Sequence, residues 1–238
     1  MMEERLNKFL AECGVCSRRD ADKLIEDGRV KVNNQTAVMG MKVCDSDSVT
    51  VNDQPVHSKN EKVVLAYNKP RGVTCTEKDR FADKKITDMI HYPIRVTYAG
   101  RLDKESEGLI LLTNDGELIN DLMRGSKGHE KEYEVKISKE VTEEFIDKMS
   151  GGIFLKEVNI KTRPCKVTKT GKFSFNIILT EGVNRQIRRM CETQNCYVTH
   201  LKRVRVANIT LANLKIGEFR KIEGIELQAL YKIARNEM

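Results

Sequence analysis

Apolar positions at helical spacing predict two short helices at the start of the chain. Within residues 3–12 and 18–26 the apolar side chains recur at intervals of three or four, which places them on one face of each helix. They are Leu6, Phe9, Leu10, Ala21, Leu24 and Ile25. Ser17 is the predicted N-cap of the second helix, and Asp27-Gly28 is predicted to end it.

The hydrophobic period then changes from helical to alternating. Residues 29–34 and 49–56 alternate apolar and polar side chains around Asn-rich turns, which is typical of short strands. Residues 57–62 are polar and unpatterned, so we place a linker there. The sequence therefore predicts a first domain over residues 1–58, built from two helices followed by short strands.

Short strands and short helices alternate irregularly from residue 63 onward. Strands are predicted at 63–68, 108–113, 131–137, 174–179 and 206–211, and helices at 116–124, 142–149 and 184–194. No regular succession of strand, helix and parallel strand is visible. We therefore expect residues 63–238 to form an α+β domain, with a mixed and mainly antiparallel sheet flanked by helices.

The positive charge of the chain is unevenly distributed. The formal net charge is +7, yet residues 1–58 hold eight Lys/Arg against ten Asp/Glu, so the remainder carries an excess of nine positive charges. Residues 185–205 contain one acid, Glu192, and six basic residues. These are Arg185, Arg188, Arg189, Lys202, Arg203 and Arg205. Guanidinium groups suit phosphate recognition, so the cluster favours a nucleic-acid partner over a merely solvated helix face.

Composition also excludes several classes of protein. No apolar run approaches the roughly 18 residues of a membrane span, and the N-terminus lacks the apolar core of a signal peptide. The seven cysteines show no disulfide spacing, which favours a reducing compartment, and we expect a cytoplasmic protein. Cys13 and Cys16 have metal-knuckle spacing, but a zinc site would need a second pair, for which Cys191 and Cys196 are too widely spaced. We expect no metal.

Candidate chemistry begins at GRLDKESEGLILLTNDGEL, residues 100–118. The preceding VTYA predicts a strand that runs into a turn, and Gly108 opens a buried strand. Asn114 or Asp115 is explained as the cap of the next helix. Asp103 precedes no helix and lies at the mouth of the buried strand. A carboxylate there can act as a nucleophile or base if a cation holds it ionised and oriented.

Three kinds of site compete for this acidic loop. Two carboxylates from Asp103, Glu105 and Glu107 would make a glycosidase pair, but residues so close together are poorly placed to flank a sugar. A Mg²⁺ site lacks a phosphate loop or further carboxylates in support. The third is a lone catalytic aspartate that attacks a nucleoside. It needs a basic channel, a stacking aromatic residue and a cationic partner.

The N-terminal sequence RLNKFLAECGVCSRRDADKLIEDGRVKVNNQ resembles the S4 RNA-binding domain over residues 3–52. The resemblance implies that this domain presents basic and polar residues to structured RNA. These are Arg5, Asn7, Lys8, Ser17, Arg18, Arg19, Lys23, Arg29 and Lys31. The net charge of −2 over residues 1–58 is unexpected for an RNA-binding domain. RNA binding therefore requires that the acidic residues lie on one face of the domain and the basic residues on another.

Three later blocks, GRLDKESEGLILLTNDG, KEYEV and EGVNRQIRRMCE, resemble in this order the RsuA-type ribosomal RNA pseudouridine synthases. The segment NRQIRRMCE is most similar to the RluF-like branch of this family, whose members modify the RNA of the large ribosomal subunit. The resemblance covers residues 3 to about 222 and implies isomerisation of uridine in a 23S rRNA stem-loop, without cofactor or metal. We expect a monomer. The alternatives are the same reaction on 16S rRNA or tRNA, and a non-catalytic S4-type assembly factor.

The same resemblance assigns roles to particular residues. Asp103 would be the essential carboxylate, which either attacks C1′ of the ribose or takes the 2′ proton, and Arg188 would pair with it. Tyr133 would stack on the target base and assist proton transfer, unless it is an ordinary cross-strand aromatic residue. The remaining substrate-binding candidates are Arg101, Asn184, Arg185, Ile187 and Arg189. Of these, Ile187 would form the apolar floor of the pocket, unless it belongs to the core alone.

Overall fold

The computed structural model describes residues 3–44, 46–57, 60–77, 79, 81–124 and 127–237. Its chain forms two compact units, one of Met1–Val63 with Tyr92–Arg95 and one of Val64–His91 with Val96–Met238. Residues 58 and 59 of the predicted linker lie outside the described part. None of the described helices is long and apolar enough to cross a membrane.

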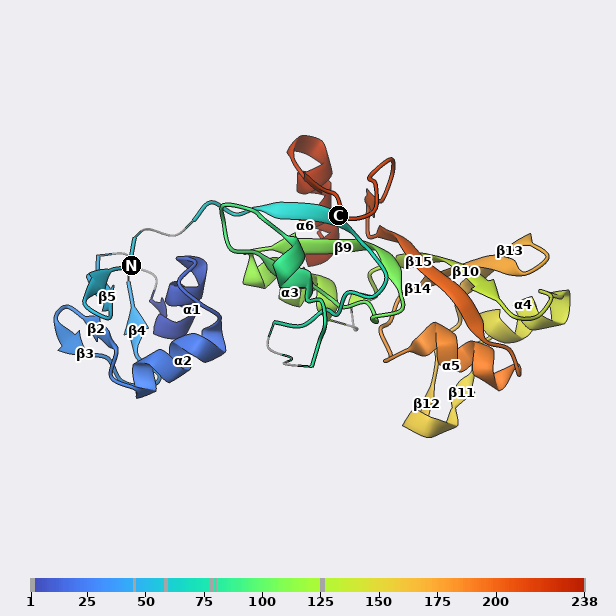
Figure 1. Ribbon diagram of the computed structural model, residues 1–238, viewed down its shortest axis with the longest axis horizontal. Helices are drawn as coiled ribbons and strands as arrows, with labels where there is room; N and C mark the ends of the chain where they lie inside the picture. The colour runs from blue at the N-terminus through green and yellow to red at the C-terminus, as the bar shows by residue number, and fades with distance from the viewer. Residues whose placement is uncertain are drawn as a thin grey trace. The chain divides into compact units, whose positions relative to one another are not determined.

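The first unit has the predicted order of two helices followed by short strands (Figure 1). Its elements are β1 (Glu4–Arg5), α1 (Leu6–Glu12), α2 (Arg18–Glu26), β2 (Val30–Val32), β3 (Gln35–Thr36), β4 (Lys42–Val43), β5 (Val49–Val51) and β6 (Gln54–Pro55). The Ser17 side chain caps α2 by accepting the backbone N–H of Asp20, as predicted. The predicted first helix begins only at Leu6, because Glu4 and Arg5 pair with β4 as a strand.

The strands of the first unit form a four-stranded sheet in the order β3-β2-β5-β6 and a separate β1-β4 pair. One buried cluster joins the inner faces of both helices to this sheet. It includes Leu6, Leu10, Ala21, Ile25, Val30 and Val49. The six apolar positions chosen from the helical period therefore all lie in this core or pack against it.

The second unit is built on one nine-stranded sheet. Its strands are β7 (Val64–Lys69), β8 (Thr97–Ala99), β9 (Glu107–Thr113), β10 (Lys131–Ile137), β13 (Lys166–Gly171), β14 (Ser174–Leu179), β15 (Val198–Val206), β16 (Ile209–Thr210) and β17 (Phe219–Lys221). The main order is β13-β14-β10-β15-β9-β7-β17, with β8 on β9 and β16 on β15. The β15–β9 pair is parallel and the others are antiparallel, so the predicted mixed and mainly antiparallel sheet is confirmed.

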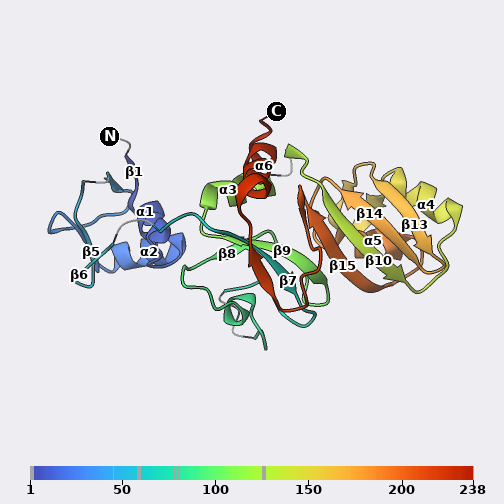
Figure 2. The same cartoon turned by 90° about the horizontal axis from the view of Figure 1, so that it is seen from above.

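Helices pack on the two halves of this sheet and build two cores (Figure 2). Helices α3 (Gly116–Met123) and α6 (Gly224–Arg235) lie together against β7 and β9. Helices α4 (Glu143–Ser150) and α5 (Gln186–Thr193) cover β10, β14 and β15. The short elements η1 (Ile86–Met89), η3 (Lys156–Val158) and the hairpin β11 (Phe154–Leu155) with β12 (Ile160–Lys161) complete the described structure.

The second unit differs from the sequence prediction in several places. The strand predicted at 206–211 is split, because Ala207 adopts a left-handed conformation with φ of 53° and turns the chain between β15 and β16. The long strand β15 was not predicted, because a basic residue, Arg203, occupies one of its buried positions and hides the alternation. Helix α6 was also not predicted.

Candidate active site

Asp103 lies in the loop that joins the antiparallel strands β8 and β9. The loop begins at Gly100, whose φ of +80° would strain any other residue; an added Cβ would also lie 2.7 Å from the Met123 sulfur, which would have to shift. A tight turn follows, in which the Ser106 N–H donates to the Asp103 carbonyl at 3.0 Å. The Asp103 side chain is 30% exposed. The aspartate is therefore partly open to solvent on a backbone that is fixed at both ends.

Lys69 supports this loop from inside the protein. It is the last residue of β7, it is fully buried, and its ammonium donates to the carbonyls of Ser106 at 2.7 Å and Pro70 at 2.9 Å. Burial lowers the pKa of Lys69, while negative groups around the loop, Asp103 among them, act in the opposite direction. Sequence reasoning missed this lysine, because a lysine that follows the polar Asn68 at the end of a strand gives no local sign that it is buried.

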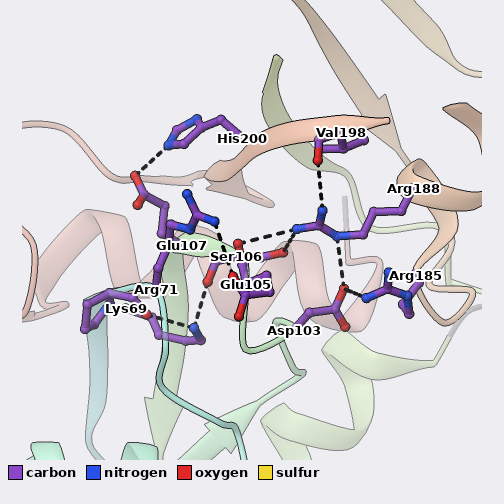
Figure 3. Close-up of polar contacts among 11 residues, drawn as sticks. Lys69, Arg71, Asp103, Glu105, Ser106, Glu107, Arg185, Arg188, Val198 and His200 are labelled. Atoms are coloured by element: carbon purple, nitrogen blue, oxygen red, sulfur yellow. Dashed lines mark hydrogen bonds and ion pairs between the residues drawn. The ribbon is translucent and has the colours of Figure 1, made fainter. Parts of the chain in front are cut away.

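Two arginines from the start of α5 converge on the aspartate (Figure 3). Arg188 Nε lies 3.7 Å from Asp103 Oδ2, and Arg185 Nη1 lies 3.9 Å from the same oxygen. Arg188 is held from its other side, because its Nη1 donates to the Val198 carbonyl at 3.3 Å and its Nη2 to Ser106 Oγ at 3.3 Å. Its buried Nε has no hydrogen-bond partner among the described residues and faces the carboxylate.

Electrostatics around Arg188 favour an anion. Burial lowers the pKa of its guanidinium, the charge of Arg185 lowers it further, and Asp103 acts in the opposite direction. A guanidinium nevertheless stays protonated at neutral pH. Arg185 has a φ of +53°, a left-handed conformation that costs an ordinary residue about 1–2 kcal/mol. This strained residue directly precedes α5 and brings its guanidinium within ion-pairing distance of Asp103.

A cavity of about 820 Å³ lies between the Asp103 loop, the segment before and within α5, and one face of β10 and β15. Its lining includes Asp103, Tyr133 and Arg188. It also includes Arg101, Asn184, Arg185 and Ile187. Ile187 is at the same time 4% exposed and part of the core under α5, so its two predicted roles are compatible. The segments that carry these residues are far apart in the sequence.

Arg189 does not line the cavity. Its guanidinium forms an ion pair with Glu157, and its Nε donates to the Asn184 carbonyl at 3.1 Å. The other two carboxylates of the acidic loop are engaged elsewhere: Glu105 pairs with Arg71 at 3.2 Å and Glu107 with His200 at 3.2 Å (Figure 3). Within the described residues there is no cluster of three or more His, Cys, Asp or Glu that could hold a metal ion.

The RNA-binding candidates of the first unit fall into two groups. Five belong to local contacts: Asn7 bonds Asp22, Lys8 pairs with Glu4 and Glu12, Ser17 caps α2, Arg29 bonds Asn52 and Lys31 pairs with Asp53. The other four are exposed and form no ion pair within the described part of the chain. These are Arg5, Arg18, Arg19 and Lys23. Exposed cations on α2 therefore coexist with the net negative charge of this region.

Family models match both units of the chain. The model described as RNA pseudouridylate synthase matches residues 63–193, and the model of the S4 domain matches residues 4–49. The predicted S4 resemblance is thereby confirmed.

Individual relatives match over nearly the whole chain. The chain is 44% identical to the dual-specificity RNA pseudouridine synthase RluF of Escherichia coli (strain K12), over 98% of this chain and 80% of that protein. It is 38% identical to the ribosomal large subunit pseudouridine synthase B of Bacillus subtilis (strain 168), over 97% of both chains. A crystal structure of a pseudouridylate synthase superposes with a TM-score of 0.70 at 28% identity, covering 95% of this chain and 99% of that one.

Proposed function

The chain belongs to the RNA pseudouridylate synthase family and carries an S4 domain, and from this membership we propose that it isomerises specific uridines in ribosomal RNA. It is an RNA pseudouridine synthase. We assign catalysis to residues 63–238 with Asp103 as the essential carboxylate, and RNA binding to residues 1–58. The observation that carries this proposal is the meeting of Asp103, Tyr133 and Arg188 around one cavity.

The reaction breaks the C1′–N1 bond of a uridine, turns the uracil, and joins its C5 to C1′. N1 gains a proton and C5 loses one, so the product is an isomer and no oxidant or reductant is consumed. Asp103 either attacks C1′ to form a sugar ester or removes the 2′ proton to form a glycal. In both routes it starts as a carboxylate, whose charge Arg185 and Arg188 neutralise and whose orientation they fix.

The target base has to leave its stack to reach Asp103. A cavity of about 820 Å³ has the size of small-molecule sites, which is enough for a nucleoside. Stacking on Tyr133 offsets part of the flipping cost by about 1–3 kcal/mol. Arg101 and Asn184, at the same cavity, would then contact the flipped nucleotide.

The name of the Bacillus subtilis relative favours the large ribosomal subunit, and hence 23S rRNA, as the substrate. The first unit supports a structured stem-loop, because exposed cations such as Arg18 and Arg19 suit phosphate contacts along folded RNA. The word dual-specificity in the name of the Escherichia coli relative makes tRNA the second candidate. We further propose a monomer that acts in the cytoplasm.

Pseudouridine mapping tests this function. Ribosomal RNA and tRNA from cells lacking the chain are compared with RNA from cells complemented by the wild type or by Asp103→Asn. We expect at least one 23S rRNA site to be lost, restored by the wild type and not restored by the variant. Loss of a tRNA site alone would show that the substrate is tRNA and not ribosomal RNA. An unchanged map of both RNAs would refute the function.

A further inference from the structure

Arg203 is a buried arginine without a counter-ion. It lies on β15, is 3% exposed, and donates through Nε to the Leu109 carbonyl at 2.6 Å. Its Nη2 is buried without a hydrogen-bond partner, and none of the described carboxylates forms an ion pair with it. Arg203 also lines the cavity that contains Asp103. Unpaired buried donors are rare in folded proteins and tend to mark functional sites.

The neighbouring Arg205 shows how unusual this is. The register of β10 against β15 shifts, so that Glu132 lies opposite Arg205 while Tyr133 lies opposite Arg203. Glu132 and Tyr133 are successive residues of β10, so their side chains point to opposite faces of the sheet. The arginines that lie opposite them therefore also point to opposite faces, although they are two positions apart on β15. Arg205 pairs with Glu132 and with Glu130, each at 2.9 Å. The fold therefore supplies two carboxylates to one arginine and none to the other.

Lys131 adds a second positive charge to the same face. It precedes Tyr133 by two positions on β10, which places both side chains on the cavity side of the sheet. Burial lowers the pKa of Lys131, and the charge of Arg203 lowers it further. Its ammonium makes one long hydrogen bond, to the His129 carbonyl at 3.4 Å. Two cations thus flank the proposed stacking residue without a compensating acid among the described residues.

We propose that Arg203, with Lys131 beside it, binds a carbonyl oxygen of the flipped uracil and stabilises the negative charge that the ring carries after the C1′–N1 bond breaks. This inference rests on the proposed function and names the part of the same site that receives the leaving group. It assigns to Arg203 a role opposite in sign to that of Asp103.

Depth and position favour the base over a phosphate as the occupant. The phosphates of a bound strand follow its backbone at the mouth of a pocket, whereas a flipped base enters deepest. Arg203 is almost fully buried and lies cross-strand from Tyr133, so its free nitrogen is placed for the edge of a ring that stacks on the tyrosine.

The charge that Arg203 meets follows from electron balance. When the C1′–N1 bond breaks, its electron pair leaves with the uracil and spreads over N1, O2 and O4. When C5 bonds to C1′, those electrons form the new bond and the negative charge returns to the Asp103 carboxylate. C5 then loses its proton and N1 gains one, which leaves the net charge unchanged. A preorganised donor at a ring oxygen therefore acts most strongly between the two steps.

The test uses the full chain and a transcript that carries the mapped target site, made with uridine or with 5-fluorouridine. Fluorine stabilises the departing ring as an anion, so cleavage of fluorouridine needs less help from the protein. For Arg203→Met we expect a loss on the order of 10²–10³ in the single-turnover rate on uridine, with RNA affinity changed less than about threefold. On fluorouridine, followed as disappearance of that nucleoside, the loss is expected to shrink at least about tenfold.

Thermal unfolding shows whether Arg203→Met folds. Arg203→Lys is a second variant that keeps the positive charge, and it can be tested if Arg203→Met does not fold. We expect it to lose less on uridine than Arg203→Met and to show the same dependence on fluorine. Arg220→Gln is the matched control in the same unit, since Arg220 pairs with Glu226 and does not line the cavity, and its rates are expected to stay near those of the wild type.

A normal uridine rate in a folded Arg203→Met or Arg203→Lys, or an equal loss on both transcripts, would overturn the inference. The wild type and Asp103→Asn are run in parallel. An inactive wild type would count against the proposed function itself. If the wild type is active and Asp103→Asn is inactive, the proposed function stands, and a failed prediction for the Arg203 variants counts only against the role of Arg203.

Discussion

Arg188 Nε lies 3.7 Å from Asp103 Oδ2, although one residue belongs to α5 and the other to the β8–β9 loop. Arg188 also holds the loop itself through Ser106 Oγ and ties it to β15 through the Val198 carbonyl. The arginine therefore neutralises the carboxylate and fixes its backbone support at the same time.

Asp103→Asn is expected to abolish pseudouridine formation and to leave RNA affinity within a few-fold of the wild type. An amide of nearly the same shape cannot serve as the nucleophile or base, while the cavity and the basic surface remain. Nucleoside analysis of the reacted RNA measures the first effect and filter binding the second. A normal rate of conversion in this variant would show that the essential carboxylate has been misassigned.

Arg188→Met should lower kcat on the order of 10²–10³-fold, the loss typical of one removed electrostatic contact in a water-excluded site. Arg188→Lys should recover only part of it, because an ammonium cannot reach Asp103, Ser106 and Val198 together. Arg220→Gln is the control, since Arg220 is an arginine of the same unit that pairs with Glu226. Equal kcat for Arg188→Met and the control would contradict the proposed role.

Two substitutions of Tyr133 distinguish stacking of its ring on the target base from ordinary packing within the protein. Tyr133→Phe keeps the ring, so kcat/KM should fall only by what the hydroxyl contributes to proton transfer. Tyr133→Leu removes the stacking surface and should lower kcat/KM further, by about 5–150-fold, as expected for about 1–3 kcal/mol. Steady-state kinetics with the mapped transcript measure both. If the two variants have the same kcat/KM, stacking on this ring is not used.

Lys69→Met should reduce the free energy of unfolding by about 1–3 kcal/mol, because the Ser106 carbonyl would lose its buried donor. Denaturant titration followed by circular dichroism measures the change. Lys166→Met, at an exposed position on β13, is the control and should be close to neutral. Activity should fall as well, since the Asp103 loop loses its internal support.

The pH dependence of Lys69→Met has a definite sign. Burial lowers the folded-state pKa of Lys69 below its ordinary value of 10.5, so the unfolded chain binds more protons just below that value. This lysine therefore makes wild-type stability rise with pH between its folded-state pKa and 10.5, and Lys69→Met lacks that rise. Unfolding titrations of both proteins from neutral pH upward should show a widening difference. A constant or narrowing difference would contradict the assignment.

Arg18→Ala with Arg19→Ala should weaken binding to ribosomal RNA and make it less dependent on salt. Each lost phosphate contact removes about 0.7–0.9 from the slope of log affinity against log salt. The measurement is RNA binding at several salt concentrations. Lys42→Ala, which removes a lysine that pairs with Glu3, is the control and should keep the wild-type slope. Unchanged affinity in the double variant would remove α2 from the RNA-binding surface.

Local signals in the sequence determined most of the secondary structure. The strands at 131–137 and 174–179 and the helix at 18–26 have the predicted bounds, because period and capping act between residues a few positions apart. The quoted motifs likewise pointed to the family, since each block is contiguous.

Tertiary structure alone decided what depends on the pairing of distant segments. The β15–β9 pairing lays β15 beside the end of the Asp103 loop, and the shifted register against β10 separates Arg203 from Arg205. In the sequence, Lys69 looks like an ordinary polar residue at the end of a strand. Only the fold shows that the loop above it buries its ammonium group. Register and burial arise from contacts between strands remote in the chain, and no short stretch of sequence contains that information.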